Sequence, residues 1–185
     1  MRIIGGASRG LHLTPVGEGD AKAHLRPTSD RVRESIFNLL INGGYGNPVN
    51  GARVLDIFAG TGALGLEALS RGAAHATFIE NGAAAMALLK RNIGLMRAED
   101  RCEILRRDAT KPGVNPGPGY DLIFLDPPYG KALGEAALVA LTPWLAPAAL
   151  VVWEESTAPA IPTGFAILDQ RKYGDTLITI LKAPE

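Results

Sequence analysis

The chain has 185 residues, 46% of them hydrophobic, and its 19 Lys and Arg residues are matched by 19 Asp and Glu residues. This length supports one well-buried core and is too short for two ordinary domains, while a net charge of zero excludes nucleic-acid binding through a bulk positive field. The single cysteine, Cys102, excludes an internal disulfide and a thiolate zinc site.

The first fifty residues carry a local basic excess. We expect residues 1–50 to form a basic arm and a helix within the same domain as residues 51–185. The basic residues up to position 33 are Arg2, Arg9, Lys22, Arg26, Arg31 and Arg33, against the acids Glu18, Asp20 and Asp30. The predicted elements are short strands at residues 3–4 and 11–14 and a helix over residues 30–41. Thr28 or Ser29 would cap that helix, because a hydroxyl can accept a hydrogen bond from a free backbone N–H.

From residue 52 onward, strand and helix patterns alternate, which is typical of a parallel sheet covered by helices on both faces. The predicted strands are 53–57, 74–79, 103–106, 120–125 and 149–153, and the predicted helices are 63–71, 83–96 and 133–141. Residues 165–168 and 176–181 flank the turn Tyr173-Gly174-Asp175, which predicts an antiparallel hairpin that closes the sheet. The predicted fold class is α/β.

A glycine-rich turn joins the first of these strands to the first of these helices, in the sequence Asp-Ile-Phe-Ala-Gly-Thr-Gly-Ala-Leu-Gly (residues 56–65). Glycines permit positive φ, and free N–H groups at a helix start attract anionic groups. Gly60, Gly62 and Gly65 also fit the GxGxxG pattern of dinucleotide sites, so the spacing alone leaves the ligand open. Asp56 favours a cationic ligand, because its carboxylate repels a pyrophosphate and suits an ammonium and a sulfonium charge.

Two further acids follow the next two strands. Glu80 ends the second strand and Asp108 follows the third. A carboxylate at the first position can accept both ribose hydroxyls of an adenosyl group, and one at the second can accept the adenine amino group. Each acid alone is equally consistent with a solvated surface residue. Together with Asp56 they form a series at the carboxyl ends of three successive strands, where open α/β sheets bind ligands.

The sequence Asp126-Pro127-Pro128-Tyr129, the Asp-Pro-Pro-Tyr motif, comes directly after an apolar strand. Two prolines could simply end the strand, and the aromatic ring could pack. The motif also suits an exocyclic amine of a nucleobase, a poor nucleophile that needs hydrogen-bond acceptors to favour its pyramidal form. The Asp126 carboxylate and the Pro127 carbonyl would be two such acceptors on a stiff backbone. Tyr129 offers a face on which an extruded base can stack.

With these motifs the chain resembles the RsmD family, bacterial methyltransferases that form N2-methylguanine in 16S ribosomal RNA. The resemblance covers nearly the whole chain. It rests on Arg-Ile-Ile-Gly-Gly at residues 2–6, Arg-Pro-Thr at 26–28, Arg-Val-Arg-Glu at 31–34, Phe-Asn at 37–38, the glycine turn and the Asp-Pro-Pro-Tyr motif. It implies a Rossmann-like class I methyltransferase fold, with a mostly parallel seven-stranded sheet and an antiparallel last hairpin. It also implies S-adenosyl-L-methionine as cofactor and ribosomal RNA, free or within a small-subunit particle, as partner.

The site residues follow from the motifs and from the basic excess. The expected cofactor-binding residues are Asp56, Phe58, Ala59, Gly60, Thr61, Gly62, Glu80, Asn81, Asp108 and Ala109. The expected catalytic residues are Asp126, Pro127, Pro128 and Tyr129. The expected RNA-binding residues are Arg2, Arg9, Arg26, Arg31 and Arg33, whose guanidinium groups would contact phosphates.

Other functions remain open at this point. A nicotinamide-dependent oxidoreductase fits the glycine turn but leaves the Asp-Pro-Pro-Tyr motif without a role, and a catalytically silent RNA-binding module uses neither motif. An amino-methyltransferase acting on N6 of adenine in DNA or RNA shares the motif. Enzymes that modify glutamine in proteins usually carry Asn at the first position, where this chain has Asp126.

The remaining residues of chemical interest have simpler interpretations. Cys102 is expected to be a small core residue, and the scattered His12, His24 and His75 indicate no metal site. The pair Glu154-Glu155 is expected to be solvated rather than part of the site. No signal peptide or apolar run of roughly 20 residues is evident, so we expect a cytoplasmic protein with no membrane partner. We also expect a monomer.

Overall fold

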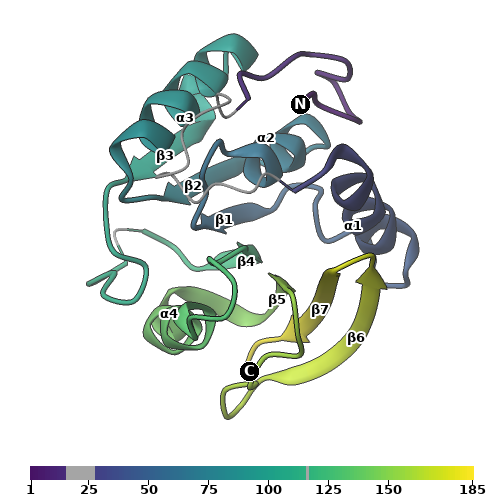
Figure 1. Ribbon diagram of the computed structural model, residues 1–185, viewed down its shortest axis with the longest axis vertical. Helices are drawn as coiled ribbons and strands as arrows, with labels where there is room; N and C mark the ends of the chain where they lie inside the picture. Colours follow the sequence, from purple (N-terminus) through teal and green to yellow (C-terminus); the bar gives the residue numbers. More distant parts are fainter. Residues whose placement is uncertain (16–27, 116) are drawn as a thin grey trace.

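The computed structural model describes residues 1–15, 28–115 and 117–185 of the chain. These residues form a seven-stranded sheet with the strand order β3-β2-β1-β4-β5-β7-β6 (Figure 1). The helices are α1 (Asp30–Asn42), α2 (Ala63–Ser70), α3 (Ala83–Met96) and α4 (Leu133–Leu141), with short 3-10 helices at Glu99–Arg101 and Thr142–Trp144. The strands are β1 (Arg53–Ile57), β2 (His75–Ile79), β3 (Cys102–Leu105), β4 (Tyr120–Leu125), β5 (Leu145–Glu155), β6 (Ala166–Tyr173) and β7 (Thr176–Lys182). The predicted α/β fold class is confirmed.

The first five strands run parallel and the last two form a reversed hairpin. β1 pairs in parallel with β2 and β4, β2 pairs with β3, and β4 pairs with β5. β7 is antiparallel to both β5 and β6, so the predicted closing hairpin is confirmed. Because parallel strands share one direction, the carboxyl ends of β1 to β5 lie along one edge of the sheet. Two predicted strands are too short, since β5 already begins at Leu145 and β6 continues to Tyr173.

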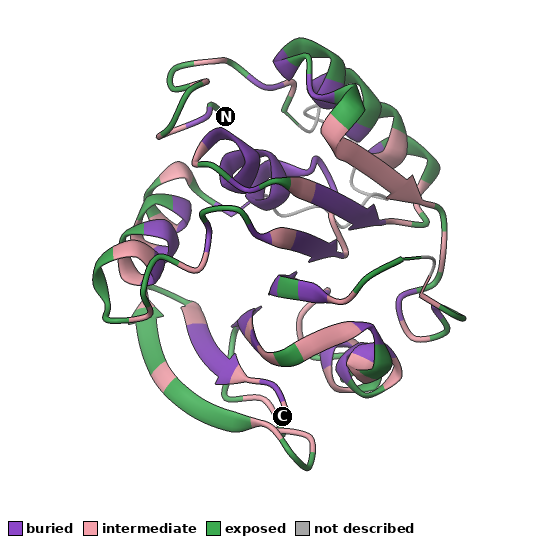
Figure 2. Cartoon of the chain, turned by 180° about the vertical axis from the view of Figure 1, so that it is seen from behind, coloured by how far each residue is buried: buried purple, intermediate pink, exposed green. Residues whose placement is uncertain are grey.

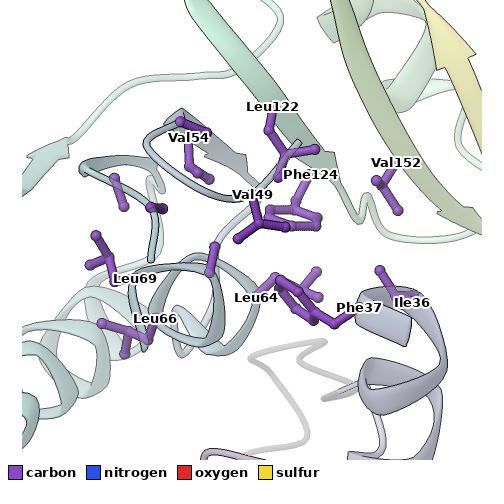
Figure 3. Close-up of a cluster of buried hydrophobic side chains, with 14 of the residues drawn as sticks. Ile36, Phe37, Val49, Val54, Leu64, Leu66, Leu69, Leu122, Phe124 and Val152 are labelled. Atoms are coloured by element: carbon purple, nitrogen blue, oxygen red, sulfur yellow. The ribbon is translucent and has the colours of Figure 1, made fainter. Parts of the chain in front are cut away.

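Each face of the sheet has its own layer of helices, because side chains alternate along a strand. On one face, Val54 of β1 and Phe124 of β4 belong to a cluster with Phe37 of α1 and with residues of α2 and α3 (Figure 3). On the other face, Leu55 of β1 clusters with Leu138 of α4. Figure 1 accordingly shows α1, α2 and α3 on one side of the sheet and α4 on the other. Figure 2 shows buried central strands and a largely exposed edge strand β6.

The predicted strands at residues 3–4 and 11–14 are wrong. An isolated antiparallel bridge between Arg2 and His12 joins these two segments, and neither forms a strand. Two backbone amides of the first segment instead donate hydrogen bonds of 2.8 Å to the carboxylate of Glu67 on α2. The segment therefore docks on a helix, which removes these donors from any strand ladder.

The surroundings of Gly6 explain why the last residue of the Arg-Ile-Ile-Gly-Gly sequence is a glycine. Its φ is +79°, and a Cβ atom at this position would lie 1.9 Å from the carbonyl oxygen of Ser70, the last residue of α2. The same carbonyl accepts a hydrogen bond of 2.7 Å from the amide of Ala7. Only glycine combines this backbone conformation with so close an approach to the helix.

Candidate active site

The turn between β1 and α2 adopts a backbone that suits its glycines. Phe58, Gly60 and Gly62 all have positive φ, at 59°, 56° and 77°. A Cβ on Gly62 would lie 2.4 Å from the Cδ1 atom of Leu89, so α3 packs closely behind the turn. The Gly60 amide donates a 2.9 Å hydrogen bond to Oε2 of Glu80, which ties the turn to the end of β2.

Asp56 lies one residue before the end of β1 and is only 2% exposed. Its Oδ2 accepts a hydrogen bond of 2.9 Å from the Gly65 amide, one of the free donors in the first turn of α2. Burial raises the pKa of Asp56 from 3.8 to about 8, with repulsion from Glu80 adding to the rise and the Gly65 hydrogen bond opposing it. A positively charged ligand beside this carboxylate would favour its ionised form, whereas a pyrophosphate would raise the pKa further.

Glu80 and Asp108 occupy the carboxyl ends of β2 and β3, as the sequence predicts. Besides Gly60, Glu80 accepts hydrogen bonds from the amides of Asn81 at 2.9 Å and Gly82 at 2.7 Å, so it organises its own loop. Asp108 is exposed, and its Oδ1 accepts bonds from the amide and hydroxyl of Thr110, which hold the pKa of this carboxyl below its usual range. Both acids retain further lone pairs with which to accept ligand hydroxyl or amino groups.

The Asp-Pro-Pro-Tyr motif begins directly after β4, the strand next to β1. The Asp126 amide donates a 3.4 Å hydrogen bond to the carbonyl of Ile57, so the motif starts beside the end of β1. Burial raises the pKa of the Asp126 carboxyl well above its ordinary value, and the negative charges of Glu154 and Asp56 raise it further. The carboxyl groups of Asp56 and Asp126 thus lie near the carboxyl ends of two neighbouring strands, and burial disfavours the anionic form of each.

Thr28 and Glu154, which were not predicted as site residues, also lie at the start of the Asp-Pro-Pro-Tyr motif. The hydroxyl of Thr28 lies 2.9 Å from Oε2 of Glu154 and 3.3 Å from Oδ2 of Asp126. The Tyr129 hydroxyl donates a 2.8 Å hydrogen bond to Oε1 of Glu154. Burial and the Glu154 charge both raise the pKa of Tyr129, which keeps its hydroxyl protonated as a donor. Ser29 caps α1 through a 3.2 Å bond from the Val32 amide, which settles the choice between the two predicted caps.

The expectation that Glu154 and Glu155 form a solvated pair is wrong. Their exposed fractions are 5% and 9%. β5 is a central strand between β4 and β7, and the register that pairs Leu125 with Trp153 brings Glu154 level with the start of the Asp-Pro-Pro-Tyr motif. The apolar run before Glu154 was a signal that the strand continued into the buried edge of the sheet.

Comparisons with known proteins place this arrangement in a family. The family model described as "Conserved hypothetical protein 95" matches residues 1–182. Ribosomal RNA small subunit methyltransferase D of Escherichia coli (strain K12) is 39% identical over 179 residues, covering 94% of this chain and 85% of that protein. The protein of the same name from Haemophilus influenzae is 37% identical over 182 residues, covering 94% and 89%. The solved structure of Escherichia coli yhhF matches with a TM-score of 0.83 at 35% identity, covering 100% of this chain and 98% of that one.

The chain belongs to the RsmD family. The resemblance drawn from the motifs is therefore confirmed, and so is the methyltransferase fold that it implied. In the part of this RsmD family member that the structure describes, no group of three or more His, Cys, Asp or Glu residues could hold a metal ion. None of its described helices is long and apolar enough to cross a membrane.

The structure separates the five arginines that were expected to contact RNA. Arg9 and Arg31 are exposed. The side chain of Arg2 is 63% exposed, and its Nε lies 3.8 Å from Oδ2 of Asp30. Arg26 lies outside the described residues. Arg33 contradicts its expected role, because its side chain is fully buried.

Arg33 instead anchors α1 to the rest of the fold. Its Nη2 donates to Asp30 Oδ1 at 2.9 Å and to the carbonyl of Arg2, while its Nε lies 3.6 Å from Oε2 of Glu67. Glu67 also accepts a 2.7 Å bond from Arg71 Nε, besides the Ile4 and Gly5 amides of the N-terminal segment, residues 1–15. A guanidinium held among these partners cannot reach a phosphate without breaking a buried ion pair.

Asn92 of α3 makes a second connection between the N-terminal segment and the glycine turn. Its Oδ1 accepts a 2.7 Å bond from the Thr14 amide, and its Nδ2 donates to the Thr61 carbonyl at 3.0 Å. Asn92 is fully buried. The N-terminal segment of this RsmD family member is thus attached beside the turn that is expected to hold the cofactor.

Proposed function

We propose that this RsmD family member transfers a methyl group from S-adenosyl-L-methionine to the exocyclic N2 amino group of a guanine in 16S ribosomal RNA. The observation that carries the proposal is the placement of Asp56 and Asp126 at the carboxyl ends of the neighbouring strands β1 and β4, where the charge of Asp56 raises the pKa of Asp126. The Asp56 carboxylate suits a cationic ligand, and the Asp126 carboxylate, at the end of the next strand, suits an amine. The relatives named ribosomal RNA small subunit methyltransferase D support RNA as the substrate class.

The chemistry of the donor set fits this cofactor. The buried Asp56 suits the cationic amino-acid end, Glu80 suits the ribose hydroxyls, and the exposed Asp108 suits the adenine amino group. The residues proposed to hold the cofactor are Asp56, Phe58, Ala59, Gly60, Thr61, Gly62, Glu80, Asn81, Asp108 and Ala109. When bound, S-adenosyl-L-methionine supplies a methyl carbon on a sulfonium, and the electron pair of the breaking C–S bond remains on sulfur.

The Asp-Pro-Pro-Tyr motif acts on the target amine. The Asp126 carboxylate and the Pro127 carbonyl accept hydrogen bonds from the amine, which favours the pyramidal nitrogen whose lone pair forms the new N–C bond. The nitrogen loses one proton as it becomes a secondary amine. The raised pKa of Asp126 makes its carboxylate a suitable acceptor of that proton. Pro128 stiffens the loop, and the Tyr129 ring stacks on the base while its hydroxyl is anchored to Glu154.

The N-terminal part of the chain would hold the RNA. Within the single domain formed with residues 51–185, residues 1–50 present Arg2, Arg9 and Arg31 for phosphate contacts, and Arg26 belongs to the same basic stretch. The chain carries no net charge, so the RNA must be gripped locally at these residues. We infer that the enzyme acts as a monomer in the cytoplasm, on ribosomal RNA that is free or assembled in a small-subunit particle.

Methylation of small ribosomal subunits tests the proposal. The substrate would be 16S RNA, protein-free or in subunits, from an Escherichia coli strain that lacks its own ribosomal RNA small subunit methyltransferase D. Mass spectrometry of the nucleosides should then show N2-methylguanosine after incubation with the protein and S-adenosyl-L-methionine. The alternative function is transfer to N6 of adenine in DNA or RNA, and N6-methyladenosine as product would establish it instead. Absence of any newly formed methylated nucleoside would refute the proposed function and, for RNA, the alternative; the same incubation with unmethylated DNA tests the alternative for DNA.

A further inference from the structure

We propose that Glu154 is a positioning residue of this site: its carboxylate fixes the Tyr129 hydroxyl and, through the Thr28 hydroxyl, the carboxylate of Asp126. The inference rests on the proposed function, in which Asp126 and Tyr129 engage the target base. It extends that function to a residue on β5, outside both sequence motifs.

The two oxygens of the Glu154 carboxylate have separate donors. Oε1 accepts from the Tyr129 hydroxyl at 2.8 Å, and Oε2 accepts from the Thr28 hydroxyl at 2.9 Å. Glu154 is only 5% exposed, so little water competes for these bonds. A Tyr side chain held at its hydroxyl loses most of its freedom to swing, and its ring therefore presents a defined stacking surface.

The Thr28 hydroxyl contacts the carboxyl groups of both Glu154 and Asp126. Its single hydroxyl proton lies between two acceptors, and the distance to Glu154 Oε2 is shorter than the 3.3 Å to Asp126 Oδ2. The hydroxyl therefore donates mainly to Glu154. Asp126 keeps acceptor capacity for the amine of the substrate, while its longer contact of 3.3 Å with the threonine restrains the position of its Oδ2 atom. This contact also gives the threonine of the Arg-Pro-Thr sequence a role in the site.

The charge of Glu154 acts on Asp126 as well. Among the described residues, the titratable groups that face Asp126 are Glu154 and Glu155 on β5, Asp56 on β1 and Tyr129 of the same motif. The three carboxylates raise the pKa of Asp126, whereas the Thr28 hydroxyl lowers it. Burial is the largest cause and Glu154 the next. Removal of the Glu154 charge should therefore let Asp126 ionise at lower pH, an effect that a purely structural residue would not have.

Glu154→Gln provides the test, because it removes the charge and one acceptor while it keeps the volume. Glu155→Gln is the matched control, since the Oε1 of Glu155 accepts from the amide and hydroxyl of Ser156 instead. Three measurements apply to each variant: the single-turnover methylation rate of small subunits against pH, calorimetry with S-adenosyl-L-methionine, and a carbon-13 NMR titration of Asp126 without RNA. Thermal melting confirms that each variant is folded.

In Glu154→Gln, the maximal rate should fall about tenfold, and the acid limb of the rate profile and the Asp126 titration should both move to lower pH. Cofactor affinity should stay within about twofold, because no cofactor contact changes. Glu155→Gln should cause a smaller movement in both profiles. Thr28→Val should lower the rate and Thr28→Ser should restore it, since serine keeps the bridging hydroxyl.

The inference would be overturned if the pH–rate profile and the Asp126 titration moved equally in Glu154→Gln and Glu155→Gln. It would also be overturned if neither moved in Glu154→Gln. A loss of cofactor affinity as large as the loss of rate would overturn it too. If the unmodified protein methylates no RNA, the proposed function fails, but the NMR titration still shows whether Glu154 acts on Asp126. The two failures are therefore distinguishable.

Discussion

Arg33 and Glu67 form an ion pair in which both side chains are fully buried, with Arg33 Nε 3.6 Å from Glu67 Oε2. Glu67 also binds two backbone amides of the N-terminal segment and the Nε atom of Arg71. One carboxylate on α2 therefore connects α1, α2 and the N-terminal segment. This relationship makes Glu67 a structural centre of the fold rather than a surface acid.

Glu67→Gln should destabilise the protein by about 3–5 kcal/mol, because the buried Arg33 guanidinium loses its one buried counter-charge among the described residues and keeps only the partly exposed Asp30. Urea unfolding measures the effect. Glu99→Gln is the control, since Glu99 is exposed and its replacement should change the free energy of unfolding by about 0.5 kcal/mol or less. A Glu67→Gln variant as stable as the control variant would show that the ion pair contributes little.

Gly6→Ala should release the N-terminal segment from α2. Gly6 and Gly10 both have positive φ, at 79° and 86°, but only at Gly6 would a Cβ overlap a described atom, the Ser70 carbonyl oxygen. Gly10→Ala thus measures the conformational cost alone, and Gly6→Ala should cost about 1–3 kcal/mol more. Hydrogen exchange at the Ile4 and Gly5 amides should accelerate in Gly6→Ala only. Equal exchange in both variants would contradict the docking argument.

The pKa of Asp56 should make the ligand-free protein less stable as pH rises. The folded-state pKa of about 8 lies above the ordinary value of 3.8, so the native state binds this proton more tightly than the unfolded chain does. The stabilisation is complete below the ordinary pKa and is lost as pH rises through about 8. The melting temperature of the unmodified protein, relative to Asp56→Asn, should therefore fall between acid and alkaline pH. If the melting temperatures of the two proteins changed with pH by the same amount, the raised pKa of Asp56 would be contradicted.

Asp126→Ala should reduce single-turnover methyl transfer by roughly two or more orders of magnitude while S-adenosyl-L-methionine still binds. The reason is that Asp126 is proposed to act on the amine in the transition state rather than on the cofactor. Asp126→Asn should give an intermediate rate, because the amide keeps an acceptor oxygen and loses the charge. A cofactor titration accompanies each rate. Equal losses of cofactor affinity and rate would assign Asp126 to the cofactor site instead.

The double variant Arg9→Ala, Arg31→Ala should weaken RNA binding and reduce the salt dependence of binding by about two released counterions. Both residues are exposed in the N-terminal part, so phosphate contacts are available to them. Cofactor affinity should not change. Lys172→Ala on the exposed edge strand β6 is the matched control and should leave the salt slope unaltered. An unchanged slope in the double variant would exclude these arginines from the RNA interface.

The central fold follows from sequence because its signals are local. β1, β4 and α3 appear at their predicted bounds, since each has a local hydrophobic pattern with a marked end. β1 and α3 end before residues with positive φ, Phe58 and Arg97, and β4 ends at the Asp-Pro-Pro-Tyr motif. The positions of Glu80 and Asp108 follow in turn, because the carboxyl ends of parallel strands share one edge of the sheet. The strand predicted at residues 3–4 does not form, since the Ile3 amide bonds to the Leu11 carbonyl but the next two amides bond to Glu67 on α2 and end the ladder.

The roles of Arg33 and Glu154 could not be predicted in the same way. Arg33 stands among other arginines and resembles an RNA contact, but its burial depends on Glu67, a residue on a different helix. Glu154 is held by Thr28, which is 126 residues away along the chain. A charged residue reveals such a role only through its partner, and local patterns do not identify partners at that separation.

The pairing of β1 with β4 divides the work of the enzyme along its sequence. The acids proposed for the methyl donor lie at the ends of β1, β2 and β3, while the Asp-Pro-Pro-Tyr motif and Glu154 lie at the ends of β4 and β5. The strand pairing between the two parts consists of four residue pairs, from Val54 with Leu122 to Ile57 with Leu125. The hydroxyl of Thr28, which belongs to the first part, also contacts Glu154 and Asp126 of the second. Exchanging the second part between relatives that both carry this threonine should therefore transfer the choice of base and leave the donor site intact, so that new substrates can be acquired by recombination between β3 and β4.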